Sequence, residues 1–234
     1  MQLFFAPHPT LPLCILPEEE SRHVVKVLRC APGDEITLTD GRGTLYRALV
    51  READPRRCTV EVVATQERCG QLPYRLTLAV APPKNPERFE WMLEKATEIG
   101  VEAIVPLDCR HSERHTVNLR RSEHIVAEAM KQSLKCYLPR IAPVTPFPAL
   151  VAAPFGGVKL IAHCYGDQPR ATIAGTVRRS DDVLVLIGPE GDFSPEEVVL
   201  AHDYDFRAIT LGASRLRTET AAIMAAAEIS ILNR

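Results

Sequence analysis

The sequence lacks the features that mark a secreted, membrane-embedded or strongly basic protein. The formal net charge of its 234 residues is only −2. No run approaches the roughly 20 apolar residues that cross a bilayer, and the first residues resemble no signal peptide. We therefore expect a soluble, cytoplasmic protein. Any nucleic-acid site has to be a local basic patch, because the chain as a whole has no positive field.

Paired cysteines are missing as well. The seven cysteines are odd in number and scattered, and none forms a C-x-x-C pair. A disulfide framework or a zinc site needs closer or paired spacing. We therefore expect reduced thiols and no metal site.

The pattern of the sequence changes near residue 70. Residues 1–69 contain short apolar runs separated by turn signals such as Asp40-Gly41, which is typical of hairpins in a small barrel, and one helix that begins after Pro17. From residue 74 onward, apolar runs alternate with helical patterns, which predicts a largely parallel sheet covered by helices. The sequence therefore predicts an α/β protein with two domains, 1–69 and 74–234.

Strands and helices of the second domain follow from local signals. The predicted strands are Arg75–Val80, Ala103–Leu107, Val158–His163, Val183–Ile187 and Ala208–Leu211. Asn85-Pro86 can cap one helix and Ser122 a second. Ser194–Glu197 forms a capping box, and an Ala-rich helix runs from about Thr218 to Asn233.

Two segments follow predicted strands, at the edge where open α/β sheets bind ligands. In Ile187–Ser194, two glycines flank a Pro-Glu pair and let the backbone approach a ligand closely. The second segment, Leu211–Thr220, leads into the last helix. Either turn alone fits an ordinary connection as well as a binding site. The two together favour one shared ligand site.

These segments resemble the cofactor loops of SPOUT methyltransferases, in particular the 16S ribosomal RNA uridine-N3 methyltransferase (RsmE) family. Ile187–Glu197 resembles the family pattern I-G-P-E-G-G-h-S-x-x-E, and Leu211–Ala221 resembles L-G-x-x-h-L-R-x-E-T-A. Glu94–Val101 is similar to its K-x-x-E-L-G-V helix end, and Arg22–Arg29 to its H-h-x-x-V-L-R helix. The resemblance extends over nearly the whole chain in the same order.

The sequence departs from the family pattern in a few places. Asp192 stands where glycine is usual, and Ser214 and Arg215 stand where Arg-Ile is common. Lys131 and Lys135 replace Glu and Arg in the E-Q-S-x-R-x-x-x-P segment. These departures concern RNA contact rather than the cofactor site.

The resemblance implies both a fold and an activity. The fold is a SPOUT α/β trefoil-knot methyltransferase domain that follows a PUA/OB-like, RNA-binding β-barrel. The activity is S-adenosylmethionine-dependent methylation of uridine N3 in 16S ribosomal RNA of the small ribosomal subunit. The enzyme is expected to be a homodimer with its active site at the subunit interface, and S-adenosylmethionine is expected to bind bent within the knot.

Two side chains are candidates for catalysis. Methylation at N3 needs an acceptor for the imide proton, or cations that stabilise the uridine anion. Arg217 is assigned the cationic role, with a capping or phosphate-binding arginine as the alternative. Glu219 could accept the proton, or could only stabilise the helix dipole.

The remaining candidate residues fall into two groups. Those expected to contact the cofactor are Ile187, Gly188, Pro189, Glu190, Gly191, Leu211, Gly212, Leu216 and Thr218. Glu190 could instead only fix its turn. Those expected to contact RNA phosphates are Arg22, His23, Lys26, Arg29, Arg110 and Arg114. For the first four of these, a solvated helix face is an equal alternative.

Three other functions stay open. The cofactor loops do not separate uridine N3 from transfer RNA or ribose 2′-O as the methylated target. The near-neutral charge disfavours a non-catalytic RNA-binding or ribosome-assembly protein. A phosphate-binding nucleotide enzyme is disfavoured because no Lys-Ser/Thr pair follows the Gly-Pro-Glu-Gly turn.

Overall fold

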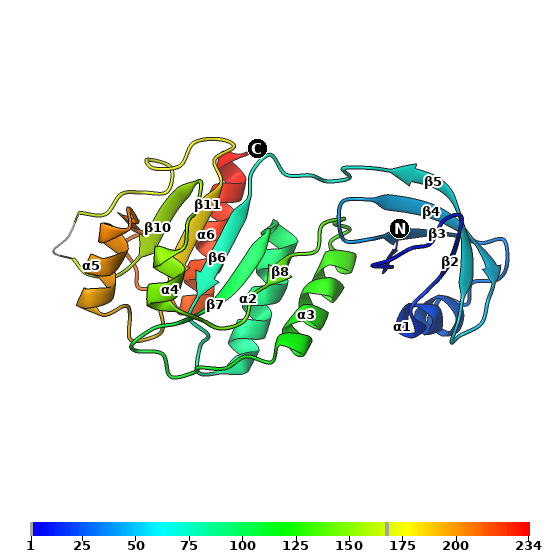
Figure 1. The fold of residues 1–234 in the computed structure, drawn as a ribbon, viewed down its shortest axis with the longest axis horizontal. Coiled ribbons are helices and arrows are strands. Elements are labelled where there is room, and N and C mark those ends of the chain that lie inside the picture. Colours follow the sequence, from blue (N-terminus) through cyan, green and yellow to red (C-terminus); the bar gives the residue numbers. More distant parts are fainter. Residues whose placement is uncertain (1, 167–168) are drawn as a thin grey trace. The chain divides into compact units, whose positions relative to one another are not determined.

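The chain forms two compact units in a computed structural model that describes residues 2–166 and 169–234 (Figure 1). The first unit comprises Met1–Gln71 and Ala127–Leu138, and the second comprises Leu72–Val126 and Pro139–Arg234. The sequence carried no signal that Ala127–Leu138 would group with the first unit. Among the described residues, no helix combines the length and the apolar character that a bilayer crossing needs.

The first unit is built on a five-stranded sheet in the order β1-β3-β4-β5-β2. Its strands are β1 (Leu3–Phe5), β2 (Leu13–Ile15), β3 (Glu35–Thr39), β4 (Leu45–Glu52) and β5 (Thr59–Gln66). β1 pairs with β3 in parallel, and the other pairs are antiparallel. Tyr46, Ala48 and Val50 of β4 alternate into the core, as expected for a sheet that buries one face. β2 was not predicted, because it lies in a proline-rich segment.

The predicted helix after Pro17 is present in an altered form. α1 (Glu18–Arg22) has three glutamates in its first turn and continues as the π-helix η1 (His23–Val27). Leu28 N donates to His23 O at 3.0 Å, a bond that spans five residues. The wider turn leaves Val24 buried but places Val27 at the surface with 66% exposure.

The second unit is a parallel sheet in the order β12-β10-β11-β6-β7-β8, with β9 paired to β7. Its strands are β6 (Leu76–Val80), β7 (Ala103–Asp108), β8 (Arg140–Ile141), β9 (Thr145–Pro146), β10 (Val158–Ala162), β11 (Val183–Ile187) and β12 (Arg207–Ile209). All residues of β11 are buried, as in a strand covered on both faces. The five predicted strands are therefore confirmed, with small shifts at their ends.

Helices cover this sheet on both faces (Figure 1). They are α2 (Pro86–Ile99), α4 (Phe147–Ala152), α5 (Pro195–Asp203) and α6 (Thr218–Leu232), while α3 (Leu119–Gln132) has residues in both units. α4 and α5 share an apolar core with Ala79 and Leu186 of the sheet. α6 packs against α2, β6 and β11. The expected α/β fold, in which a parallel sheet covered by helices follows a smaller β-rich unit, is confirmed.

Most of the predicted helix ends are present. Asn85 Oδ1 accepts from Glu87 N at 2.9 Å and caps α2, and both reciprocal bonds of the Ser194 capping box are formed. The prediction that Ser122 caps α3 is wrong. Asn118 Oδ1 accepts from Arg121 N at 3.1 Å, so the helix begins one turn earlier and Ser122 is buried within it. Both residue types cap well, and the earlier one gives the longer helix.

Candidate active site

Two turns meet at the carboxyl edge of the second unit's sheet. One follows β11 and leads to α5, and the other follows β12 and leads to α6. Thr218 Oγ1, at the start of α6, donates a buried hydrogen bond of 3.0 Å to Gly188 O. The two turns that were predicted to share one ligand therefore lie side by side.

A cavity of about 320 Å³ lies at these turns. Its lining includes most of the residues expected to contact a cofactor, together with Arg217: Ile187, Gly188, Pro189, Glu190, Leu216, Arg217 and Thr218. Sequence reasoning did not assign the other lining residues, which are Ala162, Cys164, Asp192, Arg215 and Ala221. Gly191, Leu211 and Gly212 are not among the lining residues, so their contact with a cofactor stays a prediction.

The first turn is tightly packed. Gly188 is buried, and a Cβ at this position would lie 3.1 Å from the Phe193 ring and 3.2 Å from Phe193 N. A Cβ on Gly191 would lie 3.1 Å from His111 Cβ. Glu190 Oε1 accepts from Lys84 N at 3.1 Å, so this carboxylate fixes the turn, which was one of its two predicted roles. The shape of the turn is thus set before any ligand binds.

Asp192 has a structural role of its own. Its φ is 63°, in the left-handed region that glycine adopts most easily, which explains why the family pattern has glycine there. Asp192 Oδ2 accepts from Cys164 N at 2.8 Å, and Oδ1 accepts from Phe193 N at 2.8 Å. The carboxylate therefore links this turn to the segment after β10, a link that glycine cannot make.

The second turn is open. Gly212 has a φ of 118°, and a Cβ there would meet nothing within 4 Å in the described part of the chain. Thr210 Oγ1 donates to Gly212 O at 3.1 Å and accepts from Gly212 N at 3.3 Å. Arg215 and Arg217 are exposed, and Leu216 is half-buried. Little in the protein itself restrains this turn between Gly212 and the start of α6.

The cavity suits a nucleoside cofactor in size and chemistry. Its volume of about 320 Å³ lies within the range of roughly 300 to 1,000 Å³ found for small-molecule sites. Ile187 and Leu216 provide apolar walls, and the buried turn at Gly188 brings the backbone close. Charged groups of both signs, including Asp192 and Arg217, can hold an amino-acid group.

A second cavity of about 590 Å³ adjoins the first, because Arg217 lines both. Its lining comes from the starts of α2 and α6: Asn85, Glu87, Arg88, Trp91, Arg217, Glu219 and Thr220. Glu219 is only 8% exposed, and its Oε1 lies 3.7 Å from Arg88 Nε. The structure thus brings together the two predicted catalytic residues. Arg88 and Trp91 were missed, because only the packing of α2 on α6 places them beside Glu219.

The predicted RNA contacts of the first unit lie on α1, on η1 and just after η1. Arg22, Lys26 and Arg29 are exposed, and Arg22 pairs with Glu18 at 2.8 Å. His23 is half-buried, and its ring lies edge-on to Phe4 at 5.6 Å. His23 is thus partly structural, and the RNA role of the three cations stays a prediction.

The predicted RNA contacts of the second unit lie in the loop after β7. Arg110 is exposed, and its backbone N donates to Glu197 Oε1 at 2.9 Å. Arg114 is half-buried, and its Nε donates to Thr116 O at 3.0 Å. The backbone of the loop is therefore held while the Arg110 guanidinium stays accessible.

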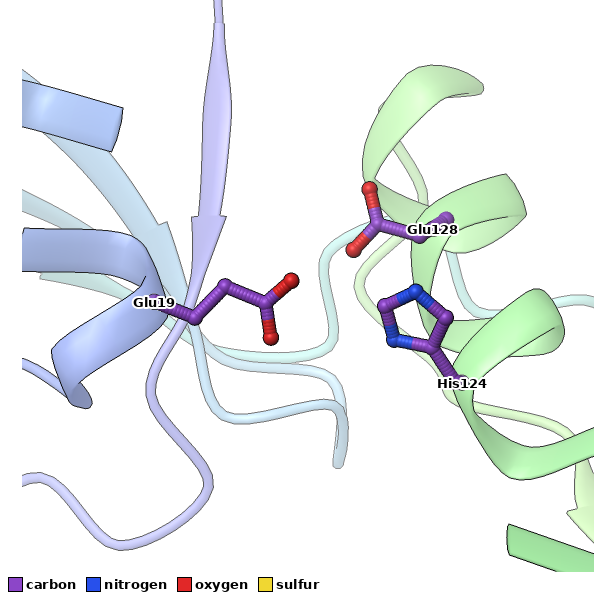
Figure 2. Close-up of side chains that lie close together, drawn as sticks. All are labelled: Glu19, His124 and Glu128. Carbon is purple, nitrogen blue, oxygen red and sulfur yellow. The ribbon is translucent and has the colours of Figure 1, made fainter. Parts of the chain in front are cut away.

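Figure 2 shows three side chains of the kinds that bind metal ions, all of them exposed: Glu19 of α1, and His124 and Glu128 of α3. Glu19 belongs to the first unit and His124 to the second. His124 and Glu128 lie one helical turn apart, a spacing that is common among solvated side chains on helices. These groups do not lead us to assign a metal, and the expectation of no metal site stays a prediction.

Comparisons with known proteins identify related RNA methyltransferases. A family model described as "RNA methyltransferase domain" matches residues 70–230, and one described as "RNA methyltransferase PUA domain" matches residues 16–63. Ribosomal RNA small subunit methyltransferase E of Synechocystis is 30% identical over 215 residues, which cover 90% of this chain and 70% of the relative.

Solved structures are similar over the full length. A probable rRNA methyltransferase from Porphyromonas gingivalis is 41% identical with a TM-score of 0.93, covering 100% of this chain and 98% of that chain. Ribosomal RNA small subunit methyltransferase E from Neisseria gonorrhoeae, solved with S-adenosylmethionine bound, is 28% identical with a TM-score of 0.88 at the same coverage.

The two family models identify the chain as an RNA methyltransferase with a PUA domain. Within that class, the chain belongs to the ribosomal RNA small subunit methyltransferase E family.

Proposed function

We propose that this protein transfers a methyl group from S-adenosylmethionine to N3 of a uridine in 16S ribosomal RNA of the small ribosomal subunit, in the cytoplasm. One observation carries the proposal. The cavity at the two glycine-containing turns adjoins a second cavity, and Arg217 lines both while Glu219 lines the second. A cofactor in the first cavity and a nucleotide in the second would therefore meet at Arg217.

The proposed mechanism divides the work between these two side chains. Bound S-adenosylmethionine supplies an electrophilic methyl carbon on sulfur. Glu219 accepts the N3 proton of the uridine, and its low exposure of 8% keeps competing water away from the carboxylate. Arg217 stabilises the negative charge that spreads onto the uracil oxygens. Glu219 then has to move off the N3–H axis, because the electron pair left on N3 lies in the ring plane where the proton was. That pair forms the new bond to the methyl carbon, and the pair of the broken carbon–sulfur bond stays on sulfur.

The test is a methylation assay with product analysis. Purified protein, S-adenosylmethionine and unmodified small ribosomal subunits should give N3-methyluridine in 16S ribosomal RNA, measured by nucleoside mass spectrometry. Arg217→Ala should reduce kcat by about 100-fold or more, the usual cost of removing a group that stabilises developing charge. Arg120→Ala, an exposed arginine of α3 outside both cavities, is the matched control.

Two results would contradict the proposal. One is the absence of any methylated uridine in the presence of bound S-adenosylmethionine. The other is a methyl group on a ribose of the 16S ribosomal RNA, or methylation of transfer RNA added in its place, which would assign the enzyme to a different target.

We further propose that the protein works as a homodimer. Met224 and Ile231 lie two turns apart on one face of α6 and are 40% and 62% exposed. An apolar stripe on a helix is typical of a surface that packs against another. Light scattering should give twice the mass of the chain. Met224→Glu combined with Ile231→Glu should give monomers, and a monomeric wild-type protein would reject this part of the proposal.

A further inference from the structure

We propose that the second cavity holds the uracil ring of the target nucleotide in one orientation. Glu219 faces N3–H, Arg88 and Arg217 face the two carbonyl oxygens, and Trp91 stacks on the ring. This inference rests on the proposed function and adds the residues that select uracil. Two of them, Arg88 and Trp91, lie on α2, outside both cofactor turns.

The hydrogen-bonding edge of uracil matches the side chains of the cavity. Its O2, N3–H and O4 groups present an acceptor, a donor and an acceptor. Arginine can only donate and an ionised glutamate can only accept, so Arg88, Glu219 and Arg217 offer the complementary set. Bases that are flipped out of RNA helices are commonly recognised on this edge.

The Arg88–Glu219 pair is loose enough to admit a base. Its Nε–Oε1 distance of 3.7 Å exceeds the roughly 2.7 to 3.2 Å of a hydrogen bond, so Glu219 can still accept a proton from a ligand. The side chain of Arg88 is 38% exposed, whereas that of Glu219 is 10% exposed. Arg88 can therefore move toward a ligand while still compensating the charge of the buried carboxylate.

The same arrangement excludes cytosine. Cytosine has no proton on N3 for Glu219 to accept, and its amino group would face a guanidinium that cannot accept a hydrogen bond. A site that leaves buried polar groups unpaired with the wrong ligand can discriminate by about 10⁴-fold. The selection of uracil over cytosine then follows from the donors of Arg88 and Arg217 and the acceptor of Glu219.

Trp91 provides the stacking surface. It lies in the N-terminal half of α2 and is 45% exposed, which is unusual for so large an apolar side chain. Stacking on aromatic side chains is the common way to hold an unpaired RNA base. Trp91 is also the only tryptophan of the chain, so protein fluorescence reports on this cavity.

The binding experiment uses that fluorescence. The protein is saturated with S-adenosylhomocysteine and titrated with a 16S ribosomal RNA fragment that carries the target uridine, or the same fragment with an abasic site there. We expect tryptophan quenching with uridine and at most about a fifth of it with the abasic fragment, since stacking requires the base. Equal quenching by the two fragments would overturn the assignment of Trp91.

The kinetic experiment separates RNA recognition from cofactor binding. Trp91→Ala should raise KM for RNA by about tenfold and leave the affinity for S-adenosylmethionine unchanged, and Trp91→Phe should recover most of the loss. Tyr204→Ala, an aromatic side chain with 40% exposure outside both cavities, is the matched control. An unchanged KM, or an equal loss of cofactor affinity, would overturn the inference.

Arg88 is tested in the same assay as a recognition and positioning residue. Arg88→Ala should lower kcat/KM by about 100-fold with normal cofactor affinity, and Arg88→Lys, which keeps the charge, should restore part of it. Melting curves check the fold of each variant. If the wild-type protein methylates no uridine, the proposed function fails. If the wild-type protein methylates uridine and the Arg88 and Trp91 variants have the same kinetic constants, only this inference fails.

Discussion

The two turns that line the cofactor cavity are built in opposite ways. In the turn after β11, neighbouring side chains surround Gly188, and Glu190 and Asp192 accept hydrogen bonds from Lys84 and Cys164. In the turn after β12, a Cβ on Gly212 would meet no described atom within 4 Å, and Arg215 and Arg217 are exposed to solvent. One turn is preformed, and the other is restrained mainly at its two ends.

This difference between the two turns suggests that each has a separate role in binding. A preformed turn costs no ordering entropy when a ligand binds, so it suits the part of the cofactor that has to be held in place. An open turn loses entropy on binding, but its side chains can adjust to two ligands. Arg217, which lines both cavities, belongs to the open turn.

The strongest test of this contrast is Gly188→Ala. The new methyl group would lie 3.1 Å from the Phe193 ring and 3.2 Å from its backbone N, so the preformed turn has to shift. We expect S-adenosylmethionine affinity, measured by calorimetry, to fall by more than about tenfold, and the free energy of unfolding to fall by about 1–3 kcal/mol. Unchanged affinity would show that this turn is not rigid.

Asp192 tests the hydrogen bonds of the same turn. Asp192→Ala removes two accepted bonds and places alanine at a φ of 63°, so we expect a loss of about 2 kcal/mol in the free energy of unfolding. Asp192→Gly removes the bonds but tolerates the φ, and should lose only about 1 kcal/mol. Urea denaturation measures both. If the glycine variant were as unstable as the alanine variant, backbone strain would not contribute.

Gly212→Ala tests the open turn. Its Cβ meets no described atom, so the cost arises from the φ of 118°, which alanine rarely adopts, and should be about 1–3 kcal/mol in the free energy of unfolding. Cofactor affinity should change by less than about threefold, because the turn can readjust. A loss of cofactor affinity as large as that of Gly188→Ala would remove the contrast between the turns.

The smallest expected effect concerns Cys164, an exposed thiol that lines the cofactor cavity. Iodoacetamide should modify it before the buried cysteines, since burial raises the pKa of thiols such as Cys58, which reaches about 11. Saturating S-adenosylmethionine should slow the modification of Cys164 by about fivefold, measured by peptide mass spectrometry. Equal rates with and without the cofactor would place the cofactor elsewhere.

Local signals made much of this structure predictable from the sequence. The Asn85 cap, the Ser194 capping box and the buried strand β11 depend on neighbours in the chain, and all three are present. The start of α3 was wrong because two suitable capping residues compete there. The continuation of α1 as a π-helix was not predicted, because the residues after Pro17 fit an ordinary α-helix equally well.

The candidate site was predictable where its residues stand in the two turns that follow β11 and β12. Arg217 and Glu219 stand in one motif, whereas Arg88 and Trp91 join them through the packing of two helices from distant parts of the sequence. Likewise, nothing in the sequence linked Asp192 to Cys164. A single sequence does not reveal such contacts between distant segments.

The hydrogen bond from Thr218 to Gly188 O also bears on how the protein is made. Translation proceeds from the N-terminus, so the turn at Gly188 leaves the ribosome before the helix that completes its site. A nascent chain that ends before α6 would therefore expose the apolar β11 and α2 surfaces that this helix covers. Such a chain would lack the bond that joins the two turns, so the cofactor site would form only after α6 has left the ribosome.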